Sequence, residues 1–278
     1  MTHSEIQMKP TKRDRQTFSG LRRIIATLRG PEGCPWDRVQ THETLRPYLL
    51  EEASETLAAL DEGDPARLRE ELGDLLLEVL LHVQIAEENG DFRMDDVVSG
   101  VAEKLVRRHP HVFEDAVAET PEAVVEQWDE IKRRERGDQS ALTGIPLALP
   151  ALAYAQAVQR RAAGAGFAFE SSFEVWEALM EELDELRRAD TPEKQRGEIG
   201  DVLFALANVA RYLDADAEDA LRQTSRGFTR RFQRVEELAR ERGLDLRDAE
   251  MEQKLALWEE AKELPSAPNH PGNRASEQ

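Results

Sequence analysis

Residues 51–55 read Glu-Glu-Ala-Ser-Glu and residues 71–74 read Glu-Leu-Gly-Asp, and the same acidic pattern returns in 181–185 and 198–201. Residues three and four apart share a helix face, so each copy predicts two helices that present carboxylates side by side. Such a cluster repels itself unless cations neutralise it, and hard divalent ions such as Mg²⁺ prefer oxygen ligands of this kind. The pattern therefore predicts one divalent-cation site in each copy.

The recurrence extends beyond the acidic residues. Both copies end in Glu, an aliphatic residue, Gly and Asp, followed by a run of apolar residues. Trp128 and Lys132 recur as Trp258 and Lys262, 130 residues later. Acidic residues make up 56 of the 278, so one copy alone would have little weight. The shared context indicates an internal duplication.

Hydrophobic periodicity predicts an all-α protein. Residues 45–60 and 68–83 carry apolar side chains at helical spacing, Gly63-Asp64-Pro65 separates the two helices, and Asn89-Gly90-Asp91 ends the second. Further helices are expected near 94–108, 121–136, 150–163, 172–189, 192–213, 216–242 and 248–263. No convincing run of alternating β-branched residues appears in the sequence.

Length and composition indicate two domains. A chain of 278 residues with 40% hydrophobic content can bury a core in each of two halves. We expect an N-terminal domain at 17–137, a linker at 138–150, a C-terminal domain at 151–264, and loose tails at 1–16 and 265–278.

Charge and cysteine content exclude several classes of function. A net charge of −19 argues against binding to a nucleic-acid backbone, which needs a basic surface. No apolar run approaches the ~20 residues of a membrane span, and the first 16 residues lack an apolar signal-peptide core. Cys34 is the only cysteine, which excludes an internal disulfide. A cytoplasmic location is the default expectation.

Two further segments accompany the acidic repeat. These are the turn at 33–37, Gly-Cys-Pro-Trp-Asp, and the segment at 107–113, Arg-Arg-His-Pro-His-Val-Phe. Together with the duplication, they closely resemble the MazG family of all-α nucleoside triphosphate pyrophosphohydrolases, from about Leu21 to Lys262. The resemblance implies Mg²⁺-dependent hydrolysis of a nucleoside triphosphate to the monophosphate and pyrophosphate. It also implies two tandem helical domains that form four-helix-bundle units in a homodimer.

The resemblance assigns roles residue by residue. The implied metal ligands are Glu52, Glu55, Glu71 and Asp74 in the first half and Glu182, Glu185, Glu198 and Asp201 in the second. Glu51 and Glu181 remain to orient or deprotonate the attacking water. The implied substrate contacts are Arg67, Lys104 and Arg108 in the first half and Lys194 and Arg231 in the second. The repeated pairs, Trp128 with Lys132 and Trp258 with Lys262, are further candidates in which the lysine reaches a phosphate. Each tryptophan either stacks on a base or anchors its domain's core, and the sequence leaves both readings open.

The halves differ around these motifs. Four residues before Arg231, where competent second domains of the family typically carry lysine, this chain has Gly227. A further family lysine, three residues before the motif, is replaced by Ala178 in the second half and Tyr48 in the first. In the first half an acid, Glu70, stands directly before the Glu-x-Gly-Asp segment. In the second half that position is Gly197. We therefore expect the first half to contribute activity of its own.

The leading hypothesis is a hydrolase that cleans nucleotide pools or limits nucleotides under stress. A narrower-substrate all-α pyrophosphohydrolase is one alternative, and a catalytically dead helical protein that binds nucleotides is another. The intact acids in both halves speak against the dead protein. Glu78, outside the motif, is expected to be an ordinary surface charge.

Overall fold

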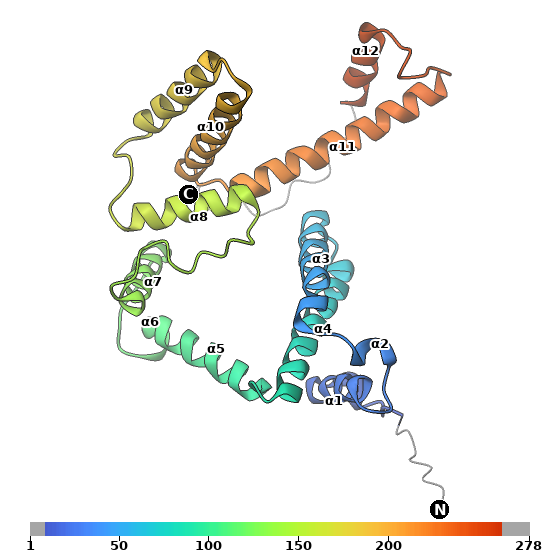
Figure 1. Cartoon of the computed structure of the whole chain (residues 1–278), viewed down its shortest axis with the longest axis vertical. Helices are drawn as coiled ribbons and strands as arrows, with labels where there is room; N and C mark the ends of the chain where they lie inside the picture. Colours follow the sequence, from blue (N-terminus) through green and yellow to red (C-terminus); the bar gives the residue numbers. More distant parts are fainter. Residues whose placement is uncertain (1–8, 263–278) are drawn as a thin grey trace, which may run out of the picture. The chain divides into compact units, whose positions relative to one another are not determined.

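The computed structural model describes residues 9–262, which form helices joined by turns, with no strand among them (Figure 1). The all-α fold class is confirmed. The elements are a 3-10 helix η1 (Asp14–Gln16), α1 (Phe18–Arg29), α2 (Pro35–Arg38), α3 (His42–Glu62), α4 (Pro65–Asn89), α5 (Met94–Arg108), α6 (Pro110–Phe113), α7 (Pro121–Arg136), α8 (Ala151–Gly164), α9 (Ser172–Arg188), α10 (Pro192–Tyr212), α11 (Ala217–Glu241) and α12 (Met251–Ala261). The predicted helices at 94–108 and 121–136 coincide with α5 and α7, whereas the one expected from 248 begins only at Met251.

The described chain divides into two compact units, residues 9–117 and 118–262. The domain limits expected from the sequence, 17–137 and 151–264, remain a prediction. Of the expected tails, residues 1–8 and 265–278 lie outside the described residues. Within the described range, every helix is too short or too polar to cross a membrane.

In unit 1 the central element is the helical hairpin of α3 and α4, which pack alongside one another. The Thr41 side chain caps α3 by accepting a hydrogen bond from the Thr44 backbone N–H. Gly63, at φ 66°, ends α3 in the left-handed conformation that glycine adopts without strain. Asp64 then caps α4, and Pro65 occupies its first turn. The turn signals in the sequence thus set where the hairpin reverses.

In unit 2 the hairpin of α9 and α10 is built in the same way. Ser171 caps α9, Thr191 caps α10, and Pro192 follows in the first turn of α10. Helix α8 packs against α10 through buried amides. The Gln156 side chain donates to the carbonyls of Ala207 and Ala215, and Gln159 donates to the Phe204 carbonyl at 2.8 Å. These bonds give partners to the amide nitrogens of two buried side chains.

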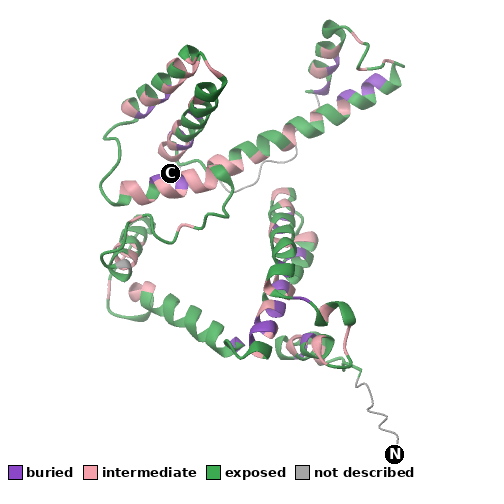
Figure 2. Ribbon diagram, viewed as in Figure 1, coloured by how far each residue is buried: buried purple, intermediate pink, exposed green. Residues whose placement is uncertain are grey.

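Each unit has its own apolar core. In unit 1 the core joins α1, α3, α4 and the start of α5 through Ile25, Leu45, Leu80, Leu81, Val83, Ile85 and Met94. In unit 2 one cluster joins α9 to α10 (Val175, Leu179, Val202 and Val209), and another joins α11 to α12 (Val235, Leu238, Ala239, Leu257 and Ala261). Figure 2 shows the buried residues as narrow stripes, whereas α5 is exposed along almost its whole length.

Candidate metal and phosphate site

Each hairpin brings three carboxylates together. In unit 1, oxygens of Glu52 and Glu55 on α3 and of Glu71 on α4 all lie within 4.8 Å of one another. In unit 2, Glu182 and Glu185 on α9 and Glu198 on α10 do the same. We call these triads the unit 1 acidic cluster and the unit 2 acidic cluster. The helical spacing of the sequence motif is what aligns the two acids of the first helix.

The fourth acid of each motif adds negative charge beside the cluster. Burial raises the pKa of Glu52, and the largest contribution from a charge comes from Asp74. Burial likewise raises the pKa of Glu182, with Asp201 the largest charge acting on it. The pKa of Glu55 is raised chiefly by the charge of Glu71. Carboxylates that raise one another's pKa in this way hold protons more tightly until a cation replaces them.

The basic residue predicted for each hairpin is placed differently in the two units. In unit 1, Arg67 Nε donates to Glu71 Oε1 at 3.2 Å, and Arg67 Nη1 lies 2.5 Å from Glu62 Oε2. In unit 2, Lys194 Nζ lies 2.8 Å from Asp190 Oδ1, and both side chains are exposed. The unit 1 acidic cluster therefore carries its own guanidinium, whereas the described partner of Lys194 is an acid outside the unit 2 acidic cluster.

The donor set of both clusters fits a hard divalent cation. Three carboxylates within 4.8 Å offer the all-oxygen environment that Mg²⁺ takes, with room for water and phosphate oxygens in the remaining positions. In unit 2, Glu198 Oε2 is buried and has no hydrogen-bond partner among the described residues. A buried carboxylate oxygen without a partner is costly, and a cation held between Glu198 and its neighbours would satisfy it.

The two acids predicted to act on water lie at the edge of the clusters. Glu51 and Glu181 are exposed, each one residue before a member of its cluster. The charge of Glu51 contributes to the raised pKa of Glu52 and Glu55, and the charge of Glu181 contributes to that of Glu182. Their side chains are thus close enough to act on the clusters electrostatically, and their role toward water stays a prediction.

Several of the other predicted substrate residues come together in pairs. Lys132 Nζ lies 4.7 Å from the ring centroid of Trp128 on α7 and 3.2 Å from Asp129. The Arg231 guanidinium on α11 lies 5.0 Å from the ring centroid of Trp258 on α12. Both are cation–π contacts, and each places a positive charge over a flat ring.

The remaining predicted substrate residues are dispersed. Lys104 is exposed and Arg108 half-buried on α5. Lys262 Nζ lies 2.5 Å from Glu259. Trp258 also packs against the apolar cluster of α11 and α12, which supports its reading as a core anchor. The contacts described for Lys132, Lys262 and Arg231 are with neighbours on α7, α11 and α12, and their role toward phosphate stays a prediction.

The expectation that Glu78 is a surface charge is wrong. Its side chain is only 6% exposed, and its Oε2 atom has no hydrogen-bond partner among the described residues. Burial raises the pKa of Glu78, and the charge of Glu52 raises it further. Glu78 lies four residues after Asp74 on α4, so it continues the face that carries Glu71 and Asp74. That spacing was the signal available in the sequence.

A histidine pair lies next along the same helix. His82 Nδ1 is 2.8 Å from His42 Nδ1, and the rings are nearly coplanar, at 4°, with centroids 5.1 Å apart. This geometry joins the rings edge to edge through one shared hydrogen, so one ring donates and the other accepts. Burial lowers the pKa of His82, and the charge of His42 lowers it further. In unit 2 the positions of Glu78 and His82 are Ala205 and Val209, so this polar extension belongs to unit 1 alone.

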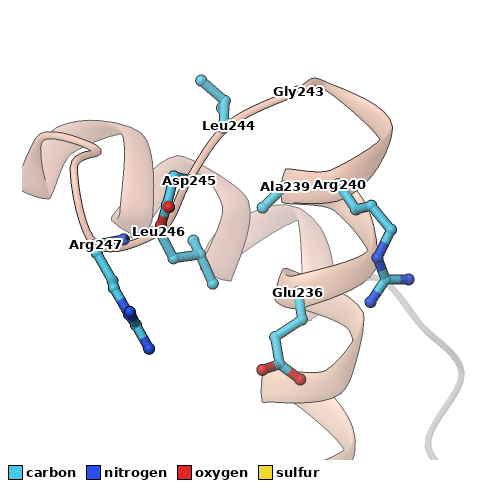
Figure 3. Close-up of a pocket in the computed structure, with 8 residues that line it drawn as sticks. All are labelled: Glu236, Ala239, Arg240, Gly243, Leu244, Asp245, Leu246 and Arg247. Carbon is cyan, nitrogen blue, oxygen red and sulfur yellow. Dashed lines mark hydrogen bonds between the residues drawn. The ribbon is translucent and has the colours of Figure 1, made fainter.

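Two surface hollows in the described chain are lined by residues outside the clusters. Figure 3 shows one where the end of α11 turns toward α12, lined by Glu236, Ala239, Arg240, Gly243, Leu244, Asp245, Leu246 and Arg247. Another is lined by Arg22, Glu87, Arg93 and Asp95 in unit 1. Neither includes a carboxylate of the acidic clusters.

Comparison with known proteins gives this arrangement a family. A family model described as the MazG nucleotide pyrophosphohydrolase domain matches residues 40–113, which contain the unit 1 acidic cluster. A protein of Thermotoga maritima named nucleoside triphosphate pyrophosphohydrolase/pyrophosphatase MazG is 44% identical over 247 residues, covering 88% of this chain and 95% of its own length. The chain belongs to the MazG family. The similarity to this relative extends through both units.

Two further relatives cover most of the chain. The nucleoside triphosphate pyrophosphohydrolase of Escherichia coli strain K12 is 42% identical over 248 residues, covering 86% of this chain and 94% of its own length. A Bacillus subtilis protein named uncharacterized protein YabN is 44% identical over 269 residues, covering 94% of this chain and 55% of its own length. The Thermotoga maritima and Escherichia coli proteins thus align with this chain over nearly their whole length.

Proposed function

We propose that this MazG-family chain hydrolyses nucleoside triphosphates, ribo- or deoxyribo-, to the monophosphate and pyrophosphate. The observation that carries the proposal is the pair of acidic clusters, each with three carboxylates within 4.8 Å on a two-helix hairpin. A cluster of this kind suits a reaction in which negative charge on phosphate oxygens has to be neutralised. The names of the Thermotoga maritima and Escherichia coli relatives support the same reaction.

In this proposal Glu52, Glu55, Glu71 and Asp74 hold Mg²⁺ in unit 1, and Glu182, Glu185, Glu198 and Asp201 hold it in unit 2. Bound Mg²⁺ supplies charge neutralisation on the triphosphate and acidifies water. Glu51 and Glu181, at the open edge of the clusters, orient the attacking water and accept its proton. Arg67 donates a hydrogen bond to Glu71 of the unit 1 acidic cluster. When substrate binds, Arg67 donates to a phosphate oxygen instead. Lys194 does the same in unit 2 after release from Asp190.

The remaining contacts of the proposal come from α5, α7, α11 and α12. Lys104, Arg108, Lys132, Arg231 and Lys262 contact phosphates, and Trp128 and Trp258 stack on the base. The proposed setting is the cytoplasm, where the enzyme cleans nucleotide pools or limits nucleotides under stress. With a net charge of −19 the proposed partners include neither nucleic acid nor a membrane.

We also propose that the working form is a homodimer that completes four-helix units. Helix α5 presents an apolar face that the described chain leaves exposed, formed by Val97, Val98, Val101, Leu105 and Val106. An exposed apolar face of this length marks an interaction surface, and a second copy supplies the matching one. Light scattering on the active protein at micromolar concentration should give twice the mass of one chain. A monomeric mass in a fully active sample contradicts the dimer.

Product analysis tests the reaction directly. With Mg²⁺ and any of the eight common ribo- and deoxyribonucleoside triphosphates that is turned over, the products should be monophosphate and pyrophosphate in equal amounts. A chelator should abolish the reaction because the carboxylates then have no cation to offer the triphosphate. Release of a diphosphate with orthophosphate would refute the proposed bond cleavage.

A further inference from the structure

An aromatic pair stands beside the unit 1 acidic cluster. The rings of Trp36 on α2 and Tyr48 on α3 meet at 78°, with centroids 5.9 Å apart. Both are large aromatic side chains that remain exposed, Trp36 by 49% and Tyr48 by 38%. Two rings at nearly right angles form a corner in which a third flat ring can lie on the face of one and against the edge of the other.

The pair lies next to the cluster along the α3 helix. Tyr48 precedes Glu52 by four residues and Glu55 by seven, so the three share one helix face. Side chains on a helix lean toward its N-terminus, so Glu52 leans toward the turn that carries Tyr48. A ligand held by its phosphates at the unit 1 acidic cluster has its next moieties within reach of the corner between Tyr48 and Trp36.

The backbone that carries Trp36 is held firmly, although its indole is exposed. The Arg29 side chain, 5% exposed, pairs with Glu88 on α4 at 2.8 Å and donates to the carbonyls of Asp37 and Gln40. The Gln40 side chain, in turn, donates to the Trp36 carbonyl at 2.9 Å. An exposed ring on a fixed turn loses little freedom on meeting a ligand, which favours binding.

Close packing fixes the preceding turn as well. A Cβ atom on Gly33 would lie 2.1 Å from the Leu28 carbonyl oxygen, so only glycine fits there. The Cys34 backbone N–H donates to the same carbonyl at 2.8 Å. This close packing supports the turn between α1 and α2, which places Trp36 against Tyr48.

Unit 2 lacks this corner. Ala178 takes the place of Tyr48, three residues before the acidic motif, and offers no ring. The two acidic clusters share their carboxylate geometry but differ in what stands one turn away on the same helix face. The aromatic corner accompanies only one of two acidic clusters that share their carboxylate geometry. Holding phosphates therefore does not explain the corner, and we look to the part of the ligand beyond the phosphates.

We infer that the corner formed by Trp36 and Tyr48 binds the nucleobase of a nucleotide whose phosphates are held at the unit 1 acidic cluster. This inference rests on the proposed function, and at unit 1 it assigns to this corner the base contact that the proposal gives to Trp128. Stacking on an aromatic face is open to every base, because each has a π-face, so the corner accepts purines and pyrimidines alike. Unit 1 therefore accepts different bases. Stacking at this corner adds to its affinity for the nucleotide, whereas Ala178 at the corresponding position of unit 2 adds none.

The test uses the full chain with Glu182→Gln and Glu185→Gln, so that binding reports on unit 1. Calorimetry with Mg²⁺ compares α,β-methylene-ATP, which cannot be cleaved at the proposed bond, with inorganic tripolyphosphate, which has no base. Tyr48→Ala and Trp36→Ala should each weaken α,β-methylene-ATP binding about tenfold, the loss of one base–aromatic stack. Tripolyphosphate binding should stay unchanged, and Trp36→Phe should restore most of the nucleotide affinity.

Phe92→Ala is the matched control, because Phe92 is another exposed aromatic residue of unit 1 but lies beyond α4, away from this helix face. It should leave both affinities unchanged. Equal weakening of both ligands, or no change in either, would overturn the inference. A change of oligomeric mass in Trp36→Ala, with both affinities altered alike, would assign the pair to a subunit contact and overturn it too.

The failure of the proposed function is distinguishable from these results. If the parent protein binds neither α,β-methylene-ATP nor tripolyphosphate, unit 1 holds no triphosphate, and the inference falls together with that function. If tripolyphosphate binds and the aromatic variants bind the nucleotide normally, the phosphate site stands and only the base site is refuted. Because Tyr48 lies on an exposed helix face, Tyr48→Ala keeps the inference testable even if Trp36→Ala disturbs its turn.

Discussion

The unit 1 and unit 2 acidic clusters are built alike and surrounded differently. Both stand on hairpins whose second helix starts at a capping residue followed by proline, Asp64-Pro65 in one and Thr191-Pro192 in the other. Both gather three carboxylates within 4.8 Å. Around unit 1 the chain adds the Arg67 guanidinium, whereas Lys194 of unit 2 turns to Asp190. The duplication kept the metal-type geometry and let the neighbouring contacts diverge.

This difference separates two requirements of a phosphate-handling site. The proposed cation sites depend on carboxylates placed by helix spacing, and that spacing is retained in both halves. The proposed substrate contacts come from residues outside the motif, and those residues differ between the units. Two acidic clusters with the same carboxylate geometry and different surroundings offer a direct way to separate the contributions of the proposed cation and substrate binding.

The largest expected effect comes from removing the carboxylates of one cluster at a time. Glu52→Gln with Glu55→Gln keeps shape in unit 1 and removes charge, and Glu182→Gln with Glu185→Gln does so in unit 2. Each pair should lower turnover at its own site on the order of a hundredfold or more, because the cation supplies much of the transition-state charge stabilisation. Steady-state hydrolysis of several nucleoside triphosphates by both variants measures the share of each unit.

Both variants should retain measurable residual activity if both units are active. Full activity in the Glu52 and Glu55 variant, with activity lost in the Glu182 and Glu185 variant, would show that unit 1 contributes nothing. Full activity in each variant separately would show that either site alone sustains the measured rate.

A smaller effect is expected from restoring a positive charge in unit 2. Gly227 lies inside α11, and a Cβ atom added there meets nothing within 4 Å, so Gly227→Lys can be accommodated without strain. A new charge-assisted contact to phosphate should raise kcat/KM of unit 2 by about tenfold, in line with its free-energy contribution. Kinetics in the Glu52→Gln and Glu55→Gln background isolates unit 2.

The matched control is Gly227→Gln, which has a similar reach and no charge. An equal rise with glutamine and lysine would mean that helix propensity, rather than phosphate binding, causes the gain. Unchanged kinetics with lysine would show that position 227 does not reach the substrate.

The smallest expected effect concerns the buried acid of unit 1. Because the folded-state pKa of Glu78 is raised, the folded protein binds its proton more tightly than the unfolded chain does. Stability is therefore lost as pH rises from the ordinary glutamate range through the folded-state pKa. Glu78→Gln removes this penalty and should raise the free energy of unfolding at pH 7 by about 1 kcal/mol, and by less at pH 4.5.

Denaturant unfolding of the metal-free protein at the two pH values measures this difference. Glu70→Gln serves as the control, because Glu70 is exposed on the same helix and should change little at either pH. A gain for Glu78→Gln that is the same at both pH values would show that the carboxylate charge is not the cause.

Much of the fold could be predicted from the sequence because its signals are local. Thr41, Gly63-Asp64-Pro65 and Thr191-Pro192 are capping and turn residues with defined backbone preferences, and the hairpins begin and end at them. The shared face of the two acids on the first helix of each hairpin followed from helical spacing. These features need no knowledge of which surfaces meet in the folded protein.

The partners of single side chains could not be predicted in this way. Whether Arg67 turns to Glu71 and Lys194 to Asp190 depends on rotamers and on the neighbouring helix, which spacing does not specify. Glu78 looked like a surface charge because a lone acid within an apolar run has that default, whereas packing of α3 on α4 buries it. The contact between Trp36 and Tyr48 required the fixed turn between α1 and α2.

Counting divalent ions tests most directly whether each hairpin holds its own cation site. Titration with Mn²⁺, followed by electron paramagnetic resonance of the free ion, should give two bound ions per chain. Removing the charge of either cluster by its pair of Glu→Gln substitutions should leave one, and the quadruple variant should bind none. Two ions retained in the quadruple variant, or none bound by the unmodified chain, would contradict the assignment of the acidic clusters as cation sites.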